Sequence, residues 1–298
     1  MKHAYLITAH TNFRILNLLF EALDDPDNDF YLLFDKKLKL SDEEIIRYQP
    51  EYSKIFTLPR AEINWGGYSL IDAELSLIKA ALQNGYDYYH YMQGSDFPIK
   101  SKEEILSFFE RNKGQEFIDF KPDFYQLAHF RCDYYHPFAD NRLCRTQKWL
   151  RYLDYGVAYA QKAVGFRRGK EALYFGSTLF SITHGFAQYV VRQESSIKKR
   201  FRKTIAADEV FLQTLLMESD FKNNSFRFGQ PYSNCYLVDW SRNNGNSPYT
   251  FVTEDYRELI TSDPFLLFAR KFNEEEDFHI IELLFEHITK NERYTRCI

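Results

Sequence analysis

Two neighbouring acids, Asp208 and Glu209, stand directly in front of the apolar run VFLQTLL. Carboxylates in the first turn of a helix interact favourably with the helix dipole, by about 0.3–1 kcal/mol, and aspartate is a preferred N-cap residue. A carboxylate can also act as a general base, which takes a proton from a reacting hydroxyl group. On this segment alone, the pattern favours capping.

A single acid, Asp96, follows the strand-like segment YDYYHYM, in the stretch QGSD. Sites for Mg²⁺ or Mn²⁺ are built from carboxylates, and one carboxylate is a poor site. A second acidic stretch, DDPDND at residues 24–29, lacks the glycine of a calcium-binding loop and contains Pro26. The sequence therefore predicts no metal site and no cofactor.

Strand-like segments alternate with helical patterns over the first 120 residues. AYLITAH, FYLLFDKK, YDYYHYM and EFIDF have the character of strands, and FRILNLLFEAL, SLIDAELSLIKAALQNG and residues 102–111 that of helices. Such alternation predicts an α/β fold, with a parallel sheet flanked by helices on both faces. Ligands of such sheets bind at the carboxyl ends of the strands. Those ends carry His10 and Thr11, Asp35, and the QGSD segment, with no P-loop and no Gly-rich dinucleotide turn.

Composition limits the classes of protein that fit. The 298 residues are 45% hydrophobic, which allows a large core, and no Gly-, Ser- or Pro-rich linker divides them, so we expect a single domain over residues 1–298. The net charge of −4 argues against nucleic acid as a partner. One basic cluster, residues 198–203, is either a solvated helix face or a contact for phosphate or a membrane surface.

The compartment is predicted from what the sequence lacks. No apolar stretch approaches the roughly 18 residues that cross a bilayer, and the first residues do not have the pattern of a signal peptide. We therefore expect a cytoplasmic protein. Its four cysteines are too sparse for a disulfide framework, and we expect them to be thiols.

Several motifs in a fixed order resemble those of one known family. They are WGGYSLIDAELSLIKAAL, YYHYMQGSDFPIKSKEEI, YFGSTLFSITHGFAQYVV, ADEVFLQTLL, VDW and FARKF. In this order they resemble the core-2/I-branching β-1,6-N-acetylglucosaminyltransferases, including bacterial and xylosyltransferase relatives, over nearly the whole chain. The resemblance implies a GT-A-like nucleotide-sugar transferase fold with a Rossmann-like, mainly parallel sheet. It also implies inversion at the anomeric carbon without a metal ion.

The resemblance gives the acids and the basic residues of the chain specific roles. It makes Glu209 the general base, which leaves the capping or orienting role to Asp208. It makes Lys271 of FARKF, with its neighbour Arg270, the contact for the diphosphate that a metal ion would otherwise neutralise. The alternative for Arg270 and Lys271 is a surface pair that follows a buried strand. A second basic residue of the family is replaced here by Tyr236, and Arg242 or the basic cluster at residues 198–203 would have to substitute for it.

The resemblance also places the nucleotide sugar. It implies that Asp35 contacts the uridine and that Trp65 lines the donor side, although a loop acid and an ordinary tight turn are the respective alternatives. It divides the domain into a nucleotide-binding half, residues 1–120, and an acceptor-binding and catalytic half, residues 121–298. The residues predicted to bind the nucleotide sugar are His10, Thr11, Asp35, Trp65, Gly94, Ser95, Asp96, Arg270 and Lys271.

The predicted function is transfer of a sugar, by default N-acetylglucosamine, from a UDP-sugar to a hydroxyl of a glycan or lipid-linked oligosaccharide. Synthesis of a bacterial surface polysaccharide or exopolysaccharide is the expected context, with the acceptor bringing the protein to the inner face of the membrane. A glycoside hydrolase, which needs two acids about 5–10 Å apart, is one alternative. A non-catalytic carbohydrate-binding protein is the other, and its glycan affinity would not depend on UDP.

Overall fold

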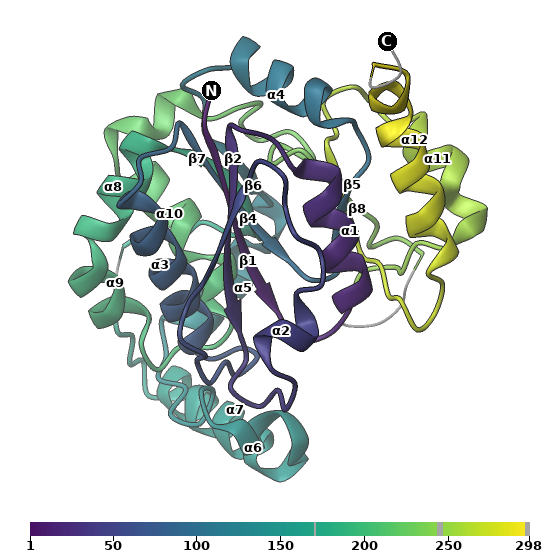
Figure 1. Ribbon diagram of the computed structural model, residues 1–298. Coiled ribbons are helices and arrows are strands. Elements are labelled where there is room, and N and C mark those ends of the chain that lie inside the picture. Colours follow the sequence, from purple (N-terminus) through teal and green to yellow (C-terminus); the bar gives the residue numbers. More distant parts are fainter. Residues whose placement is uncertain (170, 243–246, 296–298) are drawn as a thin grey trace. The chain divides into compact units, whose positions relative to one another are not determined.

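The computed structural model describes residues 1–169, 171–242 and 247–295, and Figure 1 labels its helices and strands. The chain forms two compact units, each assembled from separate segments. Unit 1 consists of residues 1–59, 92–114 and 235–298, and unit 2 of residues 60–91 and 115–234. The single domain predicted over residues 1–298, with halves at 1–120 and 121–298, stays a prediction.

Three parallel strands form the first sheet of unit 1, in the order β3-β2-β1. They are β1 (His3–Ala9), β2 (Asn28–Phe34) and β3 (Lys54–Thr57). Almost every residue of β1 and β2 is buried, as expected for strands of a parallel sheet that is covered on both faces. Helix α1 (Phe13–Leu23) connects β1 to β2, and the short α2 (Asp42–Ile45) precedes β3.

A second, three-stranded sheet in unit 1 brings together segments far apart in sequence. Its order is β5-β9-β8, with β5 (Asp96–Pro98) antiparallel and β8 (Tyr236–Val238) parallel to the central β9 (Phe268–Arg270). Helices α4 (Lys102–Arg111), α11 (Tyr256–Ile260) and α12 (His279–Thr295) complete the unit. Helix α12 packs beside α1, as the yellow and purple ribbons show (Figure 1), and it also contacts β5.

Unit 2 contains an antiparallel arrangement in which β7 lies between β4 and β6. The strands are β4 (Tyr88–Gln93), whose last two residues belong to unit 1, β6 (Phe117–Phe120) and β7 (Gly176–Thr183). The α-helices of the unit are α3 (Ser69–Leu82), α5 (Tyr125–Cys132), α6 (Arg142–Thr146), α7 (Lys148–Ala163), α8 (His184–Arg192), α9 (Glu194–Phe201) and α10 (Phe211–Met217). Helix α3 packs against α8, and α10 contacts β6 and α8.

Local sequence signals account for several element boundaries. Helix α1 spans the segment FRILNLLFEAL, which the apolar spacing predicts. Helix α4 spans the predicted residues 102–111 and begins with a capping box, in which Ser101 accepts from the backbone of Glu104 and the Glu104 side chain accepts from that of Ser101. The predicted parallel arrangement is confirmed for β1 and β2, and β3, which was not among the predicted strands, runs parallel to β2. Strand β7 runs antiparallel to both of its neighbours.

Two further predictions from composition concern the cysteines and membrane-spanning segments. Cys132, Cys144 and Cys235 are buried free thiols, and Cys297 lies outside the described residues. In the part of the chain that the structure describes, no helix is both long and apolar enough to span a bilayer.

Candidate active site

Most residues predicted to bind the nucleotide sugar lie at strand ends of unit 1. His10 and Thr11 directly follow β1, Asp35 directly follows β2, and Gly94 and Ser95 follow β4. Arg270 is the last residue of β9 and Lys271 comes next. Trp65 is the exception among them, because it lies in unit 2.

Asp96, which is buried, and Arg270, which is half-buried, form an ion pair across the small sheet. Their positions face each other in the pairing of β5 with β9, and the Arg270 guanidinium lies 2.5 Å from the Asp96 carboxylate. Arg270 also donates to the Gln93 side chain at 2.6 Å, and the Gln93 backbone N–H donates to Asp96 at 2.8 Å. Burial raises the pKa of Asp96, and the charge of Arg270 opposes that rise. Asp96 therefore serves to hold Arg270 in place within unit 1.

Lys271 carries a cationic side chain directly after β9. Its side chain is half-buried, and the ammonium nitrogen lies 3.4 Å from the Ser247 hydroxyl. Within residues 1–169, 171–242 and 247–295, Lys271 makes no ion pair. Its carbonyl accepts a 2.8 Å hydrogen bond from the Phe251 backbone, which fixes the chain at this point. A half-buried ammonium of this kind can bind an anionic ligand with a charge-assisted hydrogen bond.

Arg242, one of the two possible substitutes for the family's second basic residue, is engaged in other ion pairs. Arg242 forms ion pairs with Asp239, Asp255 and Glu258, and its guanidinium lies over the Tyr249 ring at 4.2 Å. To bind a diphosphate, this guanidinium would have to leave or share those carboxylates. Tyr236, which replaces the family's basic residue, is fully buried and stacks on Phe268, with ring centroids 5.0 Å apart.

Gly94 allows two strand ends of unit 1 to approach closely. Its N–H donates to the Thr8 carbonyl at 3.0 Å. A Cβ at this position would lie 3.0 Å from the Thr11 carbonyl oxygen and 3.1 Å from the Ala9 Cβ. Such contacts are closer than ordinary packing, so the absence of a side chain brings the turn that carries Ser95 against the end of β1.

The carboxylate of Asp35 takes part in a local turn. It accepts from the Lys37 backbone N–H at 2.9 Å and lies 3.3 Å from the Lys37 ammonium. This is the bonding of an Asx turn, which the loop-acid alternative predicts. A contact between Asp35 and uridine stays a prediction.

In unit 2, Asp208 and Glu209 occupy a 3-10 turn, Ala207–Glu209, that precedes α10. Neither side chain caps that turn or α10, so the capping role expected for Asp208 is wrong. Asp208 does not act as a cap because its side chain points into the interior of unit 2 and is buried. Of the Glu209 side chain, 29% is exposed, so Glu209 is the member of the pair that a substrate can reach.

Arg131, on α5, holds the Glu209 carboxylate in an ion pair. The same guanidinium donates to the Ala206 carbonyl at 3.5 Å and lies over the Phe175 ring at 5.1 Å. Sequence analysis missed Arg131, because it is 78 residues from Glu209 along the chain and carries no local motif. The pair orients the carboxylate that the resemblance assigns as base.

Trp65 lies on a turn that contacts the same segment of unit 2. The Gly66 carbonyl accepts a 2.8 Å hydrogen bond from the Ala206 backbone, directly before the turn with Glu209. Gly66 has φ +77°, a conformation that favours glycine, and the Trp65 side chain is 56% exposed. The structure therefore places Trp65 close to the chain that carries Glu209 within unit 2.

Asp208 shares the interior of unit 2 with a second buried acid, Glu74 of α3. Burial, together with the charge of Glu209, raises the pKa of Asp208 to about 7, and the charge of Arg131 opposes that rise. Burial and the charge of Asp208 raise the pKa of Glu74, which also accepts from the Thr178 hydroxyl at 3.1 Å. One oxygen of each acid has no hydrogen-bond partner among the described residues. Both features favour protonated side chains at these two positions.

The chain matches the model of one known protein family over most of its length. The family model of the Core-2/I-Branching enzyme matches residues 3–262. The chain belongs to the Core-2/I-branching enzyme family. This membership confirms the resemblance seen in the motifs, and the parallel strands β1–β3 with their helices confirm the predicted α/β fold class.

Curated relatives of this Core-2/I-branching protein include two xylosyltransferases. Xylosyltransferase 2 of Rattus norvegicus is 25% identical over 96% of this chain and 33% of its own length. Xylosyltransferase 1 of Homo sapiens is 24% identical over 90% of this chain and 28% of its own length. The chain thus spans about a third of the curated relatives that it matches.

Solved structures with some similarity include mouse xyloside xylosyltransferase 1 in its apo form and core-mannan synthase A of Aspergillus fumigatus. The first has a TM-score of 0.36 at 11% identity, covering 74% of this chain and 83% of its own. The second has a TM-score of 0.32 at 10% identity, covering 72% of this chain and 69% of its own.

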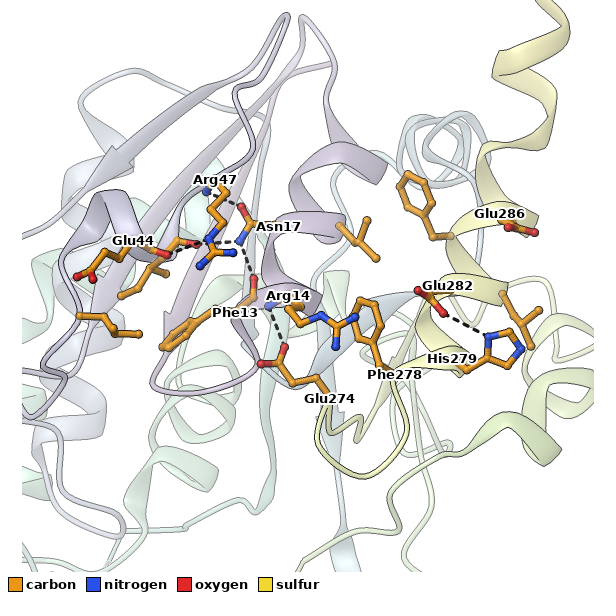
Figure 2. A pocket seen from close by; sticks show the side chains of 15 residues that line it. Phe13, Arg14, Asn17, Glu44, Arg47, Glu274, Phe278, His279, Glu282 and Glu286 are labelled. Atoms are coloured by element: carbon orange, nitrogen blue, oxygen red, sulfur yellow. Dashed lines mark hydrogen bonds and ion pairs between the residues drawn. The ribbon is translucent and has the colours of Figure 1, made fainter.

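A cavity of about 820 Å³ lies in unit 1 of this family member. It is bordered by α1, by the segment around α2, and by α12 with the residues before it, all within unit 1 (Figure 2). The guanidinium of Arg14 stacks on Phe278 there, 3.5 Å from the ring centroid, and Glu274 turns towards the start of α1. None of the residues predicted to bind the nucleotide sugar lines this cavity.

Proposed function

We propose that this protein is an inverting, metal-independent glycosyltransferase that moves a sugar from a UDP-sugar to a glycan hydroxyl. Membership in the Core-2/I-branching family supports the reaction class. The observation that carries the proposal is Lys271, a half-buried ammonium without an acid partner among the described residues, next to the Arg270–Asp96 pair. A leaving diphosphate supplies the negative charge that this cation lacks.

The reaction requires one general base for the acceptor hydroxyl and one positive charge to stabilise the leaving diphosphate. The acceptor oxygen attacks the anomeric carbon on the face opposite the diphosphate, the bond from carbon to the diphosphate oxygen breaks, and UDP leaves. In the proposed mechanism Glu209 receives the proton of the acceptor hydroxyl. Lys271 donates hydrogen bonds to the diphosphate as its charge develops. Arg131 keeps the Glu209 carboxylate oriented until the acceptor binds.

The absence of a metal ion from the mechanism is part of the proposal. Asp96, the acid that a metal site would have used, is committed to Arg270. Among the described residues, no group of three or more His, Cys, Asp or Glu side chains could hold a metal ion. The proposal therefore assigns charge neutralisation to Lys271.

The donor sugar and the acceptor belong to the proposal as well. N-acetylglucosamine is the family default, and the names of the two xylosyltransferase relatives make UDP-xylose the second donor to test. Exposed aromatic side chains of unit 2, such as Phe124, Trp149 and Tyr152, can stack on sugar rings of a glycan acceptor. We place the reaction in the cytoplasm, at the inner face of the membrane, in the synthesis of a bacterial surface polysaccharide or exopolysaccharide.

A thermal-shift screen tests the proposal directly. UDP, UDP-N-acetylglucosamine and UDP-xylose are compared with GDP, each with EDTA and with Mn²⁺. Binding at 100 times the dissociation constant adds about 2.7 kcal/mol to the free energy of unfolding, so UDP should raise the melting temperature equally well in EDTA. Stabilisation that appears only with Mn²⁺ contradicts the metal-independent mechanism, and no stabilisation by any uridine nucleotide contradicts the donor class.

A further inference from the structure

Asn12 lies between Thr11, two residues beyond β1, and the first residue of α1. Its backbone adopts a left-handed conformation, with φ 60° and ψ 47°, and its side chain is buried. Asparagine tolerates this conformation better than most residues, and it is also a preferred N-cap. Yet the Asn12 side chain caps no N–H of α1.

Glu274 performs the capping of α1 instead. Its carboxylate accepts from the backbone N–H groups of Arg14 at 2.8 Å and Ile15 at 3.2 Å. Figure 2 shows Glu274 turned towards the start of this helix. The amide of Asn12 is therefore available for other contacts.

Those contacts tie three separate segments of unit 1 together. The Asn12 side-chain amide donates to the Ser95 hydroxyl at 3.2 Å and to the Phe272 carbonyl at 3.3 Å. Its side-chain oxygen accepts from the Glu274 backbone N–H at 3.2 Å. The Phe272 backbone N–H in turn donates to the Ser95 carbonyl at 2.9 Å, which closes a ring of hydrogen bonds.

Each segment in this ring carries or adjoins a residue of the proposed donor site. Thr11 precedes Asn12, Ser95 is itself a predicted contact, and Lys271 precedes Phe272. We propose that Asn12 is a positioning residue that holds the Ser95 turn and the Lys271 segment in the arrangement that binds the diphosphate of the nucleotide sugar. This inference rests on the proposed function, since it concerns the same donor site.

The test compares Asn12→Gly with a matched change in the helix that follows, α1. Glycine keeps the left-handed backbone accessible and removes all three side-chain hydrogen bonds without adding charge. Asn17 is the control, because its side chain also makes several hydrogen bonds, donating to Phe13 and Ile45 and accepting from the Arg47 backbone (Figure 2). Asn17→Ala removes a similar number of bonds, and none of them involves a predicted donor residue.

UDP affinity is measured by calorimetry in EDTA, together with the melting temperature of each variant and the KM values for donor and acceptor. Both variants should melt at a lower temperature than the parent protein. Asn12→Gly should weaken UDP binding by about tenfold, the effect of losing one or two net hydrogen bonds, and should raise the donor KM but not the acceptor KM. Asn17→Ala should bind UDP as the parent does.

Asn12→Asp provides the same test if the glycine variant does not fold. Aspartate keeps the acceptor for the Glu274 N–H and loses both donors, so UDP binding should again weaken. Equal UDP affinity in the parent and in whichever Asn12 variant folds overturns the positioning role, as does equal weakening in Asn17→Ala. A parent protein that binds no UDP overturns the proposed function and this inference with it.

Discussion

The buried acid Asp208 should make the stability of the protein fall as the pH rises. Its pKa is about 7 in the native state and about 3.9 in an unfolded chain. Between these values the native state holds a proton that the unfolded chain has lost, so the free energy of unfolding decreases with increasing pH. The contribution is fully present below about pH 4 and is lost by about pH 7. At about 1.4 kcal/mol for each pH unit, the total is about 4 kcal/mol.

Asp208→Asn removes this contribution, because asparagine has no ionisable proton at these pH values. The variant should therefore lose less stability than the parent between pH 4.5 and pH 8, as measured by urea denaturation. Glu74 and Glu116, two further acids of unit 2 whose pKa is raised by burial, keep their own contributions, so the slope is reduced and not abolished. Asp123→Asn, a change at an exposed acid of the same unit, is the control. Parallel pH profiles for the parent and Asp208→Asn would refute the reasoning.

The remaining predictions concern the proposed reaction. Lys271→Ala should weaken UDP binding by about 1.5–3 kcal/mol, the range for a hydrogen bond to a charged group, as measured by calorimetry. The control is Lys113→Ala, at an exposed lysine of the same unit, which should leave the UDP affinity unchanged. Equal UDP affinity in the two variants would make Lys271 a surface residue. Glu209→Gln keeps the size of the side chain but cannot accept the acceptor's proton, so turnover should fall by about 10²–10⁴ in initial-rate measurements while UDP affinity is kept. Near-parental turnover in Glu209→Gln would move the search for the base to Asp96 and Asp239.

Much of the fold can be predicted from the sequence because local signals determine it. The apolar spacing of FRILNLLFEAL and the capping box at Ser101 and Glu104 define α1 and α4 by themselves. The small sheet of β5, β8 and β9 is different, since its strands are three residues long and β5 pairs with β9 across more than 100 positions of sequence. Strands this short have no periodicity from which their partners could be predicted.

The candidate site, like the fold, could be predicted from the sequence only in part. Strand ends and family motifs point to Glu209, Lys271 and their neighbours, but the sequence gives no sign that Asp208 would be buried instead of capping a helix. Arg131 and Asn12 were missed because their roles depend on partners that only the folded chain brings within reach. Asn12 even has the residue type of a helix cap, and the contact that displaces it from this role comes from Glu274, 262 positions later.

The segmented construction of the two units also sets an order for synthesis. A ribosome releases the chain from its N-terminus, so every residue of unit 2 emerges before residues 235–295 of unit 1. Strands β1 and β2 and helix α1 are made early, but strands β8 and β9 of the same unit, and α12, which packs on α1, follow only after unit 2. Until then the nascent chain exposes apolar surface of the kind that chaperones bind. A stop codon between residues 235 and 295 would thus remove segments that unit 1 needs, although its first strands had been translated before any residue of unit 2.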